Sequence, residues 1–270
     1  MMRKILWSLV IAFSALVIVG AGGLMFFVFK GEVFDKPAET PQAALEEEEN
    51  EQSKGALSGK VICIDPGHGK TARKEKEPIY PGAAEKKATN VSGASGRLMT
   101  EEELNLLVGL ELKSTLEERG AQVYMTRTAH ECDMSNIERA EFANEKGSDL
   151  VIRIHADGSE SSSLNGASML LPSPKRENGE YLTPHVVSES RRAGELILAE
   201  VTAATGAQNR GLVERPDMTG FNWSKVPVVL LEMGFMSNPE EEAKLAGAEY
   251  RTKIVGAIAD GTEKYFLTAE

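Results

Sequence analysis

Two histidines and two glutamates stand where an apolar segment ends or where a helix is expected to begin. His68 follows a β-like run and a Pro-Gly turn, and His155 directly follows another β-like run. Glu232 ends a third apolar run, and Glu101 is the first of three consecutive glutamates after a threonine. Two imidazoles and one carboxylate can hold a catalytic Zn²⁺ with its fourth position open. The remaining glutamate can then act as a general base toward water, so these residue types predict metal-assisted hydrolysis.

The elements that must position these residues alternate between strands and helices from Gly59 onward. Alternation of this kind predicts βαβ crossovers in an α/β fold, with a mostly parallel twisted sheet and helices on both faces. Thr100 and Glu103 form a capping-box pattern that starts one helix, and Gly120 supplies its stop. The apolar patterns predict strands at 60–65, 121–126, 149–154, 166–171 and 226–232, and helices at 100–119, 136–146, about 186–205 and 240–266.

Reactive residues in open α/β sheets gather beyond the carboxyl ends of the strands. His68, Glu101, His155 and Glu232 all follow or end such elements, so we expect them to converge on one edge of the sheet. Taken alone, Glu101 has another reading, because a carboxylate in the first turn of a helix interacts well with the helix dipole. The remaining histidines at positions 130 and 185 lie in polar, loop-like stretches, and we expect them outside the site.

Residues 69–99 are rich in Gly, Lys, Ala and Ser and predict a long loop. Long loops without secondary structure are uncommon unless they are functional. The segment has few large apolar residues and lies between His68 and Glu101. We therefore expect it to border the site and to contribute to substrate engagement rather than to folding.

Residues 1–30 predict a membrane anchor. No charged residue occurs from Ile5 to Phe29, a length that can cross a bilayer as a helix. Arg3 and Lys4 precede the apolar run, so the rest of the chain is expected on the extracytoplasmic side. A cleaved signal peptide is the competing interpretation; the run is long for the apolar part of such a peptide, and no convincing cleavage site follows it.

Residues 31–58 predict an acidic, disordered linker. The segment holds Pro37, Pro41 and the run Glu46–Glu49, with few large apolar residues to bury. A docking tail for a basic partner is the alternative to a solvated spacer. The chain has a formal charge of −11, and no Lys/Arg run stands out after residue 58. Nucleic-acid binding through phosphate neutralisation is therefore not expected.

The chain has two cysteines, Cys63 and Cys132. Export would permit a disulfide between them. Cys63 nevertheless sits in an apolar run, where a cysteine commonly serves as a small buried hydrophobe. Their separation in the sequence does not match metal-ligand spacing.

Four motifs together resemble the zinc-dependent N-acetylmuramoyl-L-alanine amidases, the catalytic domains of bacterial cell-wall hydrolases and cell-separation amidases. They are Asp-Pro-Gly-His-Gly after a first strand, a Glu at the start of the next helix, Ile-His-Ala, and Pro-x-x-Leu-x-Glu-x-Gly-Phe-x-Ser-Asn. The resemblance runs from about Lys60 to Phe266. It also includes residues 123–127, 139–144 and 209–211.

The resemblance implies that His68, Glu101 and His155 bind one Zn²⁺ per chain and that Glu232 is the catalytic carboxylate. Glu101 is preferred to its two neighbouring glutamates because the family pattern is Glu-x-x-apolar-Asn-Leu. One departure is Arg153, which stands where common members carry Ser. It shares a strand face with His155, so we expect it near the site edge, as a weak candidate for substrate binding.

The second departure is the length of segment 69–99, which is longer and more basic than in compact members of that family and is expected to form a lid or a substrate wall. Lys86 and Lys87 in this segment are weak candidates for meeting carboxylates of the stem peptide, although solvated lysines are the plainer interpretation.

The implied activity is hydrolysis of the amide between the lactyl group of N-acetylmuramic acid and L-alanine of the stem peptide in peptidoglycan. The implied organisation is one zinc amidase domain over residues 59–270, held by its anchor on the wall side of the cell membrane. Two alternatives stay open. One is another exported zinc peptidase, such as a carboxypeptidase acting on stem peptides, and the other is a non-catalytic, membrane-tethered wall-binding scaffold. The sequence identifies no protein activator.

Overall fold

The structure is a computed structural model of the 270-residue chain. It describes residues 55–70, 73–176, 180 and 182–268. The chain divides into two units, Met1–Leu45 and Glu46–Glu270, and every described residue belongs to the second. The predicted anchor at 1–30 and most of the predicted linker lie outside the described residues. No helix in the described ranges has the length and apolar character needed to cross a membrane.

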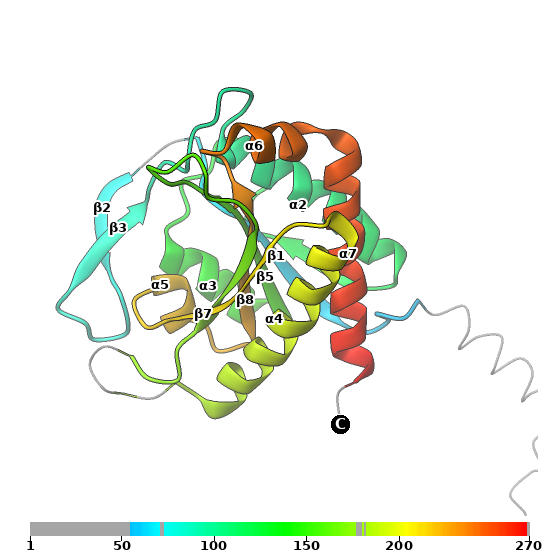
Figure 1. The fold of residues 1–270 in the computed structure, drawn as a ribbon. Helices are drawn as coiled ribbons and strands as arrows, with labels where there is room; N and C mark the ends of the chain where they lie inside the picture. Colours follow the sequence, from blue (N-terminus) through cyan, green and yellow to red (C-terminus); the bar gives the residue numbers. More distant parts are fainter. Residues whose placement is uncertain (1–54, 71–72, 177–179, 181, 269–270) are drawn as a thin grey trace, which may run out of the picture. The chain divides into compact units, whose positions relative to one another are not determined.

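A six-stranded sheet forms the centre of the domain (Figure 1). Four neighbouring strands run parallel, β8 and β6 pair antiparallel, and β6 and β7 are again parallel. The prediction of a mostly parallel sheet is therefore confirmed, with one reversal. In spatial order the strands are β4 (Gln122–Met125), β1 (Val61–Pro66), β5 (Leu150–Asp157), β8 (Val228–Phe235), β6 (Ala167–Pro172) and β7 (Asn209–Arg215).

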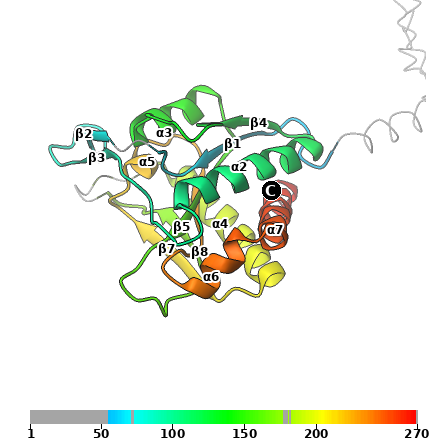
Figure 2. The same ribbon diagram turned by 90° about the horizontal axis from the view of Figure 1, so that it is seen from above.

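Helices cover both faces of this sheet, as the alternation of elements predicts (Figure 2). On one face lie α2 (Glu101–Glu118), α4 (Pro184–Thr205) and α7 (Ala248–Leu267), and on the other lie α3 (Asn136–Glu145) and α5 (Thr219–Asn222). Strand residues alternate between the two apolar clusters: Ile62 and Ile64 belong to the larger cluster, whereas Cys63 between them belongs to the smaller.

The C-terminal helical region predicted at 240–266 is two helices, α6 (Pro239–Ala246) and α7. Gly247 between them has extended backbone angles, which end the first helix. The thiols of Cys63 and Cys132 are both buried and free, so the apolar role predicted for Cys63 is confirmed. Burial raises the pKa of the Cys63 thiol far above its ordinary value, and the charge of Asp65 raises it further.

The expectation of a long, unpacked loop at 69–99 is wrong. The segment contains an antiparallel hairpin of β2 (Arg73–Pro78) and β3 (Lys86–Asn90), drawn apart from the main sheet in Figure 1. Ile79 in the connection is fully buried. The buried carboxylate of Glu77 accepts hydrogen bonds from the first two backbone amides of α3. The hairpin is thus part of the packed domain, although its strands carry no apolar run that reveals it.

The folded domain also begins before Gly59. Leu57, within the predicted linker, is fully buried in the larger core cluster. Its backbone amide donates to the carbonyl of Arg119 at 2.9 Å, just after the end of α2. A single leucine in an otherwise polar stretch gives too little pattern to move a predicted boundary.

Candidate metal centre and active site

Three residues that are far apart in the sequence meet at the carboxyl end of the parallel strands. His68 follows β1, His155 lies near the end of β5, and Glu101 is the first residue of α2. Each offers a ligand-type atom, and these atoms lie within 4.8 Å of one another. Glu101 Oε1 is 3.0 Å from His68 Nε2 and 3.0 Å from His155 Nδ1. The structure therefore brings together the three residues that the family resemblance names as ligands.

Local sequence features place these side chains. Thr100 caps α2 through the backbone amide of Glu103, which fixes Glu101 in the first turn. Gly67 lies against the imidazole of His155, and a Cβ at this position would be 2.2 Å from the ring Cε1. A Cβ at Gly93 would be 2.6 Å from Glu101 Oε2. Only glycine permits these close approaches of the backbone to two ligand side chains.

The carboxylate of Glu101 is buried and accepts several hydrogen bonds. Besides the two imidazoles, the backbone amides of Ala94 and Ala156 donate to it at 2.7 and 3.2 Å. Asn105 Nδ2 donates at 3.3 Å from one turn further along α2. Burial raises the pKa of Glu101, but hydrogen bonds from His155 and His68 outweigh this effect and lower it below the ordinary value. The group is therefore a carboxylate over the whole neutral range.

The imidazole of His155 is neutral at neutral pH, because burial lowers its pKa to about 4. Its second ring nitrogen, Nε2, is buried and has no hydrogen-bond partner among the described residues. Neutral imidazole nitrogen and ionised carboxylate oxygen are the forms that bind Zn²⁺. The cluster of His68, Glu101 and His155 thus fits a zinc ion by donor type and mutual distance, and Glu101 and His155 also fit it by protonation state.

Glu232 is beside this cluster rather than part of it. It is paired in register with His155 across β5 and β8, and with Ser168 across β8 and β6. Its Oε2 atom is enclosed and accepts no hydrogen bond from the described residues. Burial raises its pKa well above the ordinary value, and the charges of Glu101 and Asp157 raise it further. A carboxyl group with a raised pKa beside a set of possible metal ligands is a candidate general base.

Arg153 shares a sheet face with His155, as expected, but its guanidinium is bonded inside the protein. Its Nε donates to Asp65 Oδ2 at 2.7 Å, and its Nη2 donates to Asn136 Oδ1 at 3.2 Å. The side chain is only 7% exposed. Its proposed part in substrate binding stays a prediction, and these contacts assign it an internal role.

The two lysines named as weak candidates both lie on β3. Lys87 Nζ forms an ion pair with Asp217 Oδ2 at 2.6 Å and donates to the carbonyl oxygen of the same residue. Lys86 is exposed. The other two histidines, His130 and His185, are also exposed and lie outside the cluster.

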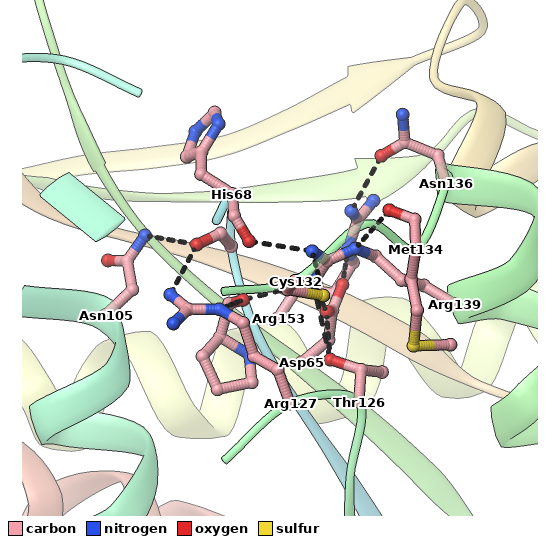
Figure 3. Close-up of polar contacts among 12 residues, drawn as sticks. Asp65, His68, Asn105, Thr126, Arg127, Cys132, Met134, Asn136, Arg139 and Arg153 are labelled. Atoms are coloured by element: carbon pink, nitrogen blue, oxygen red, sulfur yellow. Dashed lines mark hydrogen bonds and ion pairs between the residues drawn. The ribbon is translucent and has the colours of Figure 1, made fainter. Parts of the chain in front are cut away.

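Sequence reasoning missed a buried network of charged groups below His68. Asp65, Arg127 and Arg139 are each about 95% buried or more, and their side chains are linked through the turn that carries His68 (Figure 3). Asp65, a carboxylate at the end of the apolar strand β1, could have indicated this network, because a buried charge requires a partner.

Comparison with known proteins agrees with this geometry. The family description "N-acetylmuramoyl-L-alanine amidase" matches residues 62–264. The chain is 31% identical over 215 residues to the N-acetylmuramoyl-L-alanine amidase LytC of Bacillus subtilis, covering 80% of this chain and 37% of that protein. It is also 31% identical over 223 residues to the probable cell wall amidase LytH of Staphylococcus aureus, covering 81% of this chain and 62% of LytH. The chain thus spans less than two thirds of the length of these relatives.

Solved structures share the fold. The amidase Ami1 from Mycobacterium smegmatis superposes with a TM-score of 0.71 at 24% identity, covering 79% of this chain and 99% of Ami1. The catalytic domain of CwlV from Bacillus (Paenibacillus) polymyxa superposes with a TM-score of 0.60 at 25% identity, covering 78% of this chain and 99% of that domain. The region that matches the family, residues 62–264, includes His68, Glu101, His155 and Glu232. From the extent of the match, the chain belongs to the N-acetylmuramoyl-L-alanine amidase family.

Proposed function

We propose that this chain is a peptidoglycan hydrolase that cleaves the amide between the lactyl group of N-acetylmuramic acid and L-alanine of the stem peptide, with one Zn²⁺ per chain. The observation that carries the proposal is the cluster of His68, Glu101 and His155 beside the half-buried Glu232, in a member of this family. The muramoyl substrate rests on the family, since the cluster alone supports only metal-assisted hydrolysis.

The residues divide the chemistry between them. His68, Glu101 and His155 would hold the ion, which when bound supplies Lewis-acid polarisation of the scissile carbonyl and acidifies the attacking water. Glu232 accepts a proton from that water and returns it to the leaving amine of L-alanine. Water and the amide thereby become the lactyl carboxyl group and a free amine. The raised pKa of Glu232 suits both steps, because the group must gain and then lose a proton in each cycle.

The contacts of Arg153 weigh against the carboxypeptidase alternative. Such an enzyme needs a cation for the terminal carboxylate of its substrate, and Arg153, the arginine named above as a weak candidate for substrate binding, would have to be that cation. Its guanidinium is buried and paired with Asp65. A non-catalytic scaffold is disfavoured because the ligand cluster and Glu232 are all present at one edge of the sheet.

Digestion of purified peptidoglycan by the full chain tests the proposal. Mass analysis of the products should show stem peptides that begin with a free L-alanine amine and glycan strands that keep the intact lactyl carboxyl group. A chelator should stop the reaction and added Zn²⁺ should restore it. Stem peptides that are shortened from the carboxyl end would identify a carboxypeptidase instead, and intact peptidoglycan in the presence of Zn²⁺ would support the scaffold.

We also propose that residues 1–30 form an uncleaved, single-pass anchor and that the catalytic domain lies on the wall side of the cell membrane. The supporting observation is the uncharged run from Ile5 to Phe29 after Arg3 and Lys4. The acidic segment that follows would act as a spacer. Protease added to intact spheroplasts should release an active domain by cutting before Gly55, while a cytoplasmic marker protein stays whole. Protection of the domain would reverse this topology.

A further inference from the structure

The backbone of His68 has an unusual conformation. Its φ of 61° lies in the left-handed region, and among the described residues it is the single non-glycine with a positive φ. This region is unfavourable for residues with a Cβ and persists only where the surroundings enforce it. The imidazole is held on both sides, since Nδ1 is 2.8 Å from the carbonyl oxygen of Val91 and Nε2 is 3.0 Å from Glu101.

Two buried guanidinium groups bind three consecutive backbone carbonyls at this turn. The Pro66 oxygen accepts from Arg127 Nε at 2.9 Å and from Arg139 Nη1 at 3.1 Å. The Gly67 oxygen accepts from Arg127 Nη2 at 2.9 Å. The His68 oxygen accepts from Arg139 Nη2 at 2.7 Å. We call this set of contacts the carbonyl clamp; Figure 3 shows both guanidiniums directed at the turn.

Asp65 makes the clamp electrostatically possible. Its Oδ1 accepts from Arg139 Nη1 at 2.6 Å and from Thr126 Oγ1 at 2.6 Å. Asp65 is 1% exposed and Arg139 is 5% exposed, so the carboxylate compensates a guanidinium charge that would otherwise be buried without an opposite charge. Because Asp65 neutralises its charge, Arg139 can also donate hydrogen bonds to backbone carbonyl oxygens, which carry no charge.

Arg127 connects the turn to a second ligand. Its Nη2 donates to the carbonyl of Glu102 at 2.7 Å as well as to Gly67. Glu102 is the neighbour of Glu101 in the first turn of α2. The Arg127 guanidinium thus bonds the backbone next to His68 and the backbone next to Glu101. The relative position of these two ligands is therefore set by contacts among β1, α2 and the segment after β4.

We propose that Arg127 and Arg139 are positioning residues that hold His68 in the zinc-binding conformation through the carbonyl clamp. The inference rests on the proposed zinc site and assigns these arginines no contact with substrate. The fork of a guanidinium can reach two adjacent carbonyls at once, whereas the single ammonium of lysine cannot do so in the same geometry. The clamp therefore requires arginine itself, beyond the positive charge that Asp65 needs.

Arg139→Lys in the full chain tests this requirement. The zinc dissociation constant, measured by competition with a chromogenic chelator, should rise about 10- to 100-fold, the range seen when groups that orient metal ligands are removed. The absorption bands of the Co²⁺-substituted protein should shift, since they report ligand geometry. In the metal-free protein, the amide of Lys70, which donates to His130 O just after the turn, should exchange hydrogen faster than in the wild type.

Arg153→Lys is the matched control. Arg153 is equally buried and binds the same carboxylate, Asp65, but donates to none of the three carbonyls. The Arg153→Lys substitution should lower thermal stability. It should leave the zinc dissociation constant within about twofold of the wild type, which corresponds to a change in binding free energy of less than about 0.5 kcal/mol. If Arg139→Lys does not fold, Arg127→Lys decides by the same measurement, because it removes the paired contacts to Pro66 and Gly67.

The outcomes separate this inference from the proposed function. Wild-type protein that binds no zinc would overturn both. Wild-type protein that binds zinc, with Arg139→Lys or the folded Arg127→Lys binding as tightly as Arg153→Lys, would overturn the clamp alone and leave the arginines a general role in stability. Weaker zinc binding in the clamp variants, together with unchanged binding in the control, supports it.

Discussion

His155 and Glu232 are paired in register on the adjacent parallel strands β5 and β8. Paired residues on neighbouring strands point to the same face of a sheet, and the strands lie about 4.8 Å apart. The separation between a proposed ligand and the proposed general base is therefore set by the hydrogen-bond ladder of the sheet and not by a loop. This arrangement makes the two residues separable by mutation, because neither depends on the other for its position.

Replacing a ligand should remove the metal. We expect His68→Ala and His155→Ala to purify with less than about a tenth of the wild-type zinc, because two remaining ligands seldom hold the ion in competition with water. Metal content by mass spectrometry checks this. His185→Ala serves as the control, since that histidine is exposed at the start of α4 and should keep full occupancy. Full zinc content in either ligand variant would remove that residue from the site.

Glu232→Gln should keep its zinc and its fold but lose turnover. The amide is nearly isosteric with the carboxyl group but cannot accept the proton of the attacking water. A lost general base typically lowers kcat by about 10²- to 10⁴-fold. Release of soluble peptides from peptidoglycan, measured at saturating zinc, gives the comparison. Near-normal hydrolysis by this variant would exclude Glu232 from the mechanism.

Asp65→Asn should destabilise the domain most at neutral pH. The charges of Arg139 and Arg153, with hydrogen bonds from Thr126 and Arg139, outweigh burial and hold the pKa of Asp65 far below its usual range. A lowered folded-state pKa contributes stability that is present above the unfolded pKa of about 3.9 and is lost as pH falls toward the folded value.

We therefore expect Asp65→Asn to lower the free energy of unfolding by about 3–5 kcal/mol at pH 7, since it leaves buried guanidiniums without their partner. The difference from wild type should shrink below about pH 4, where the unfolded-state carboxyl of the wild type becomes protonated. Urea titrations from pH 3 to pH 7 measure it. Asp260→Asn, at an exposed ion pair with Arg119, should change stability by less than about 1 kcal/mol at any pH.

Ile79→Ala tests whether the β2–β3 hairpin is part of the folded core. The side chain is fully buried, and its truncation should lower the free energy of unfolding by about 2–5 kcal/mol. Val91→Ala, at a side chain that is 52% exposed in the same segment, should have little effect. Equal, small changes in both variants would restore the view of this segment as a dispensable loop.

The sequence predicts best where local chemistry and tertiary structure agree. The capping box of Thr100 and the stop at Gly120 predict α2 to within a residue at each end. The buried strands β1, β5 and β8 begin with apolar runs and are readily recognised. Strand β7 was missed because it lies at an edge of the sheet and is only partly buried, so its residues show no apolar pattern.

Predicting the site was easier than predicting what surrounds it. Strand ends and motif order are enough to predict that His68, Glu101, His155 and Glu232 converge. The partners of Arg153 are a different matter, because strand alternation gives the face on which a side chain lies but not its bonding. Asp65 and Arg153 are 88 residues apart in sequence, and only the register of β1 with β5 brings them together.

The reversal of β6 relative to β8 has a consequence for the rim of the site. Because β6 runs in the opposite direction, its first residues pair with the end of β8, where Ser168 is opposite Glu232. The segment that leads into β6, residues 158–166, therefore opens at the same edge as the ligands although it contributes none of them. It is anchored at its end by Leu164 and Gly166, and most of its earlier residues are exposed. Insertions in this segment would reshape the rim of the site without disturbing a ligand-bearing strand.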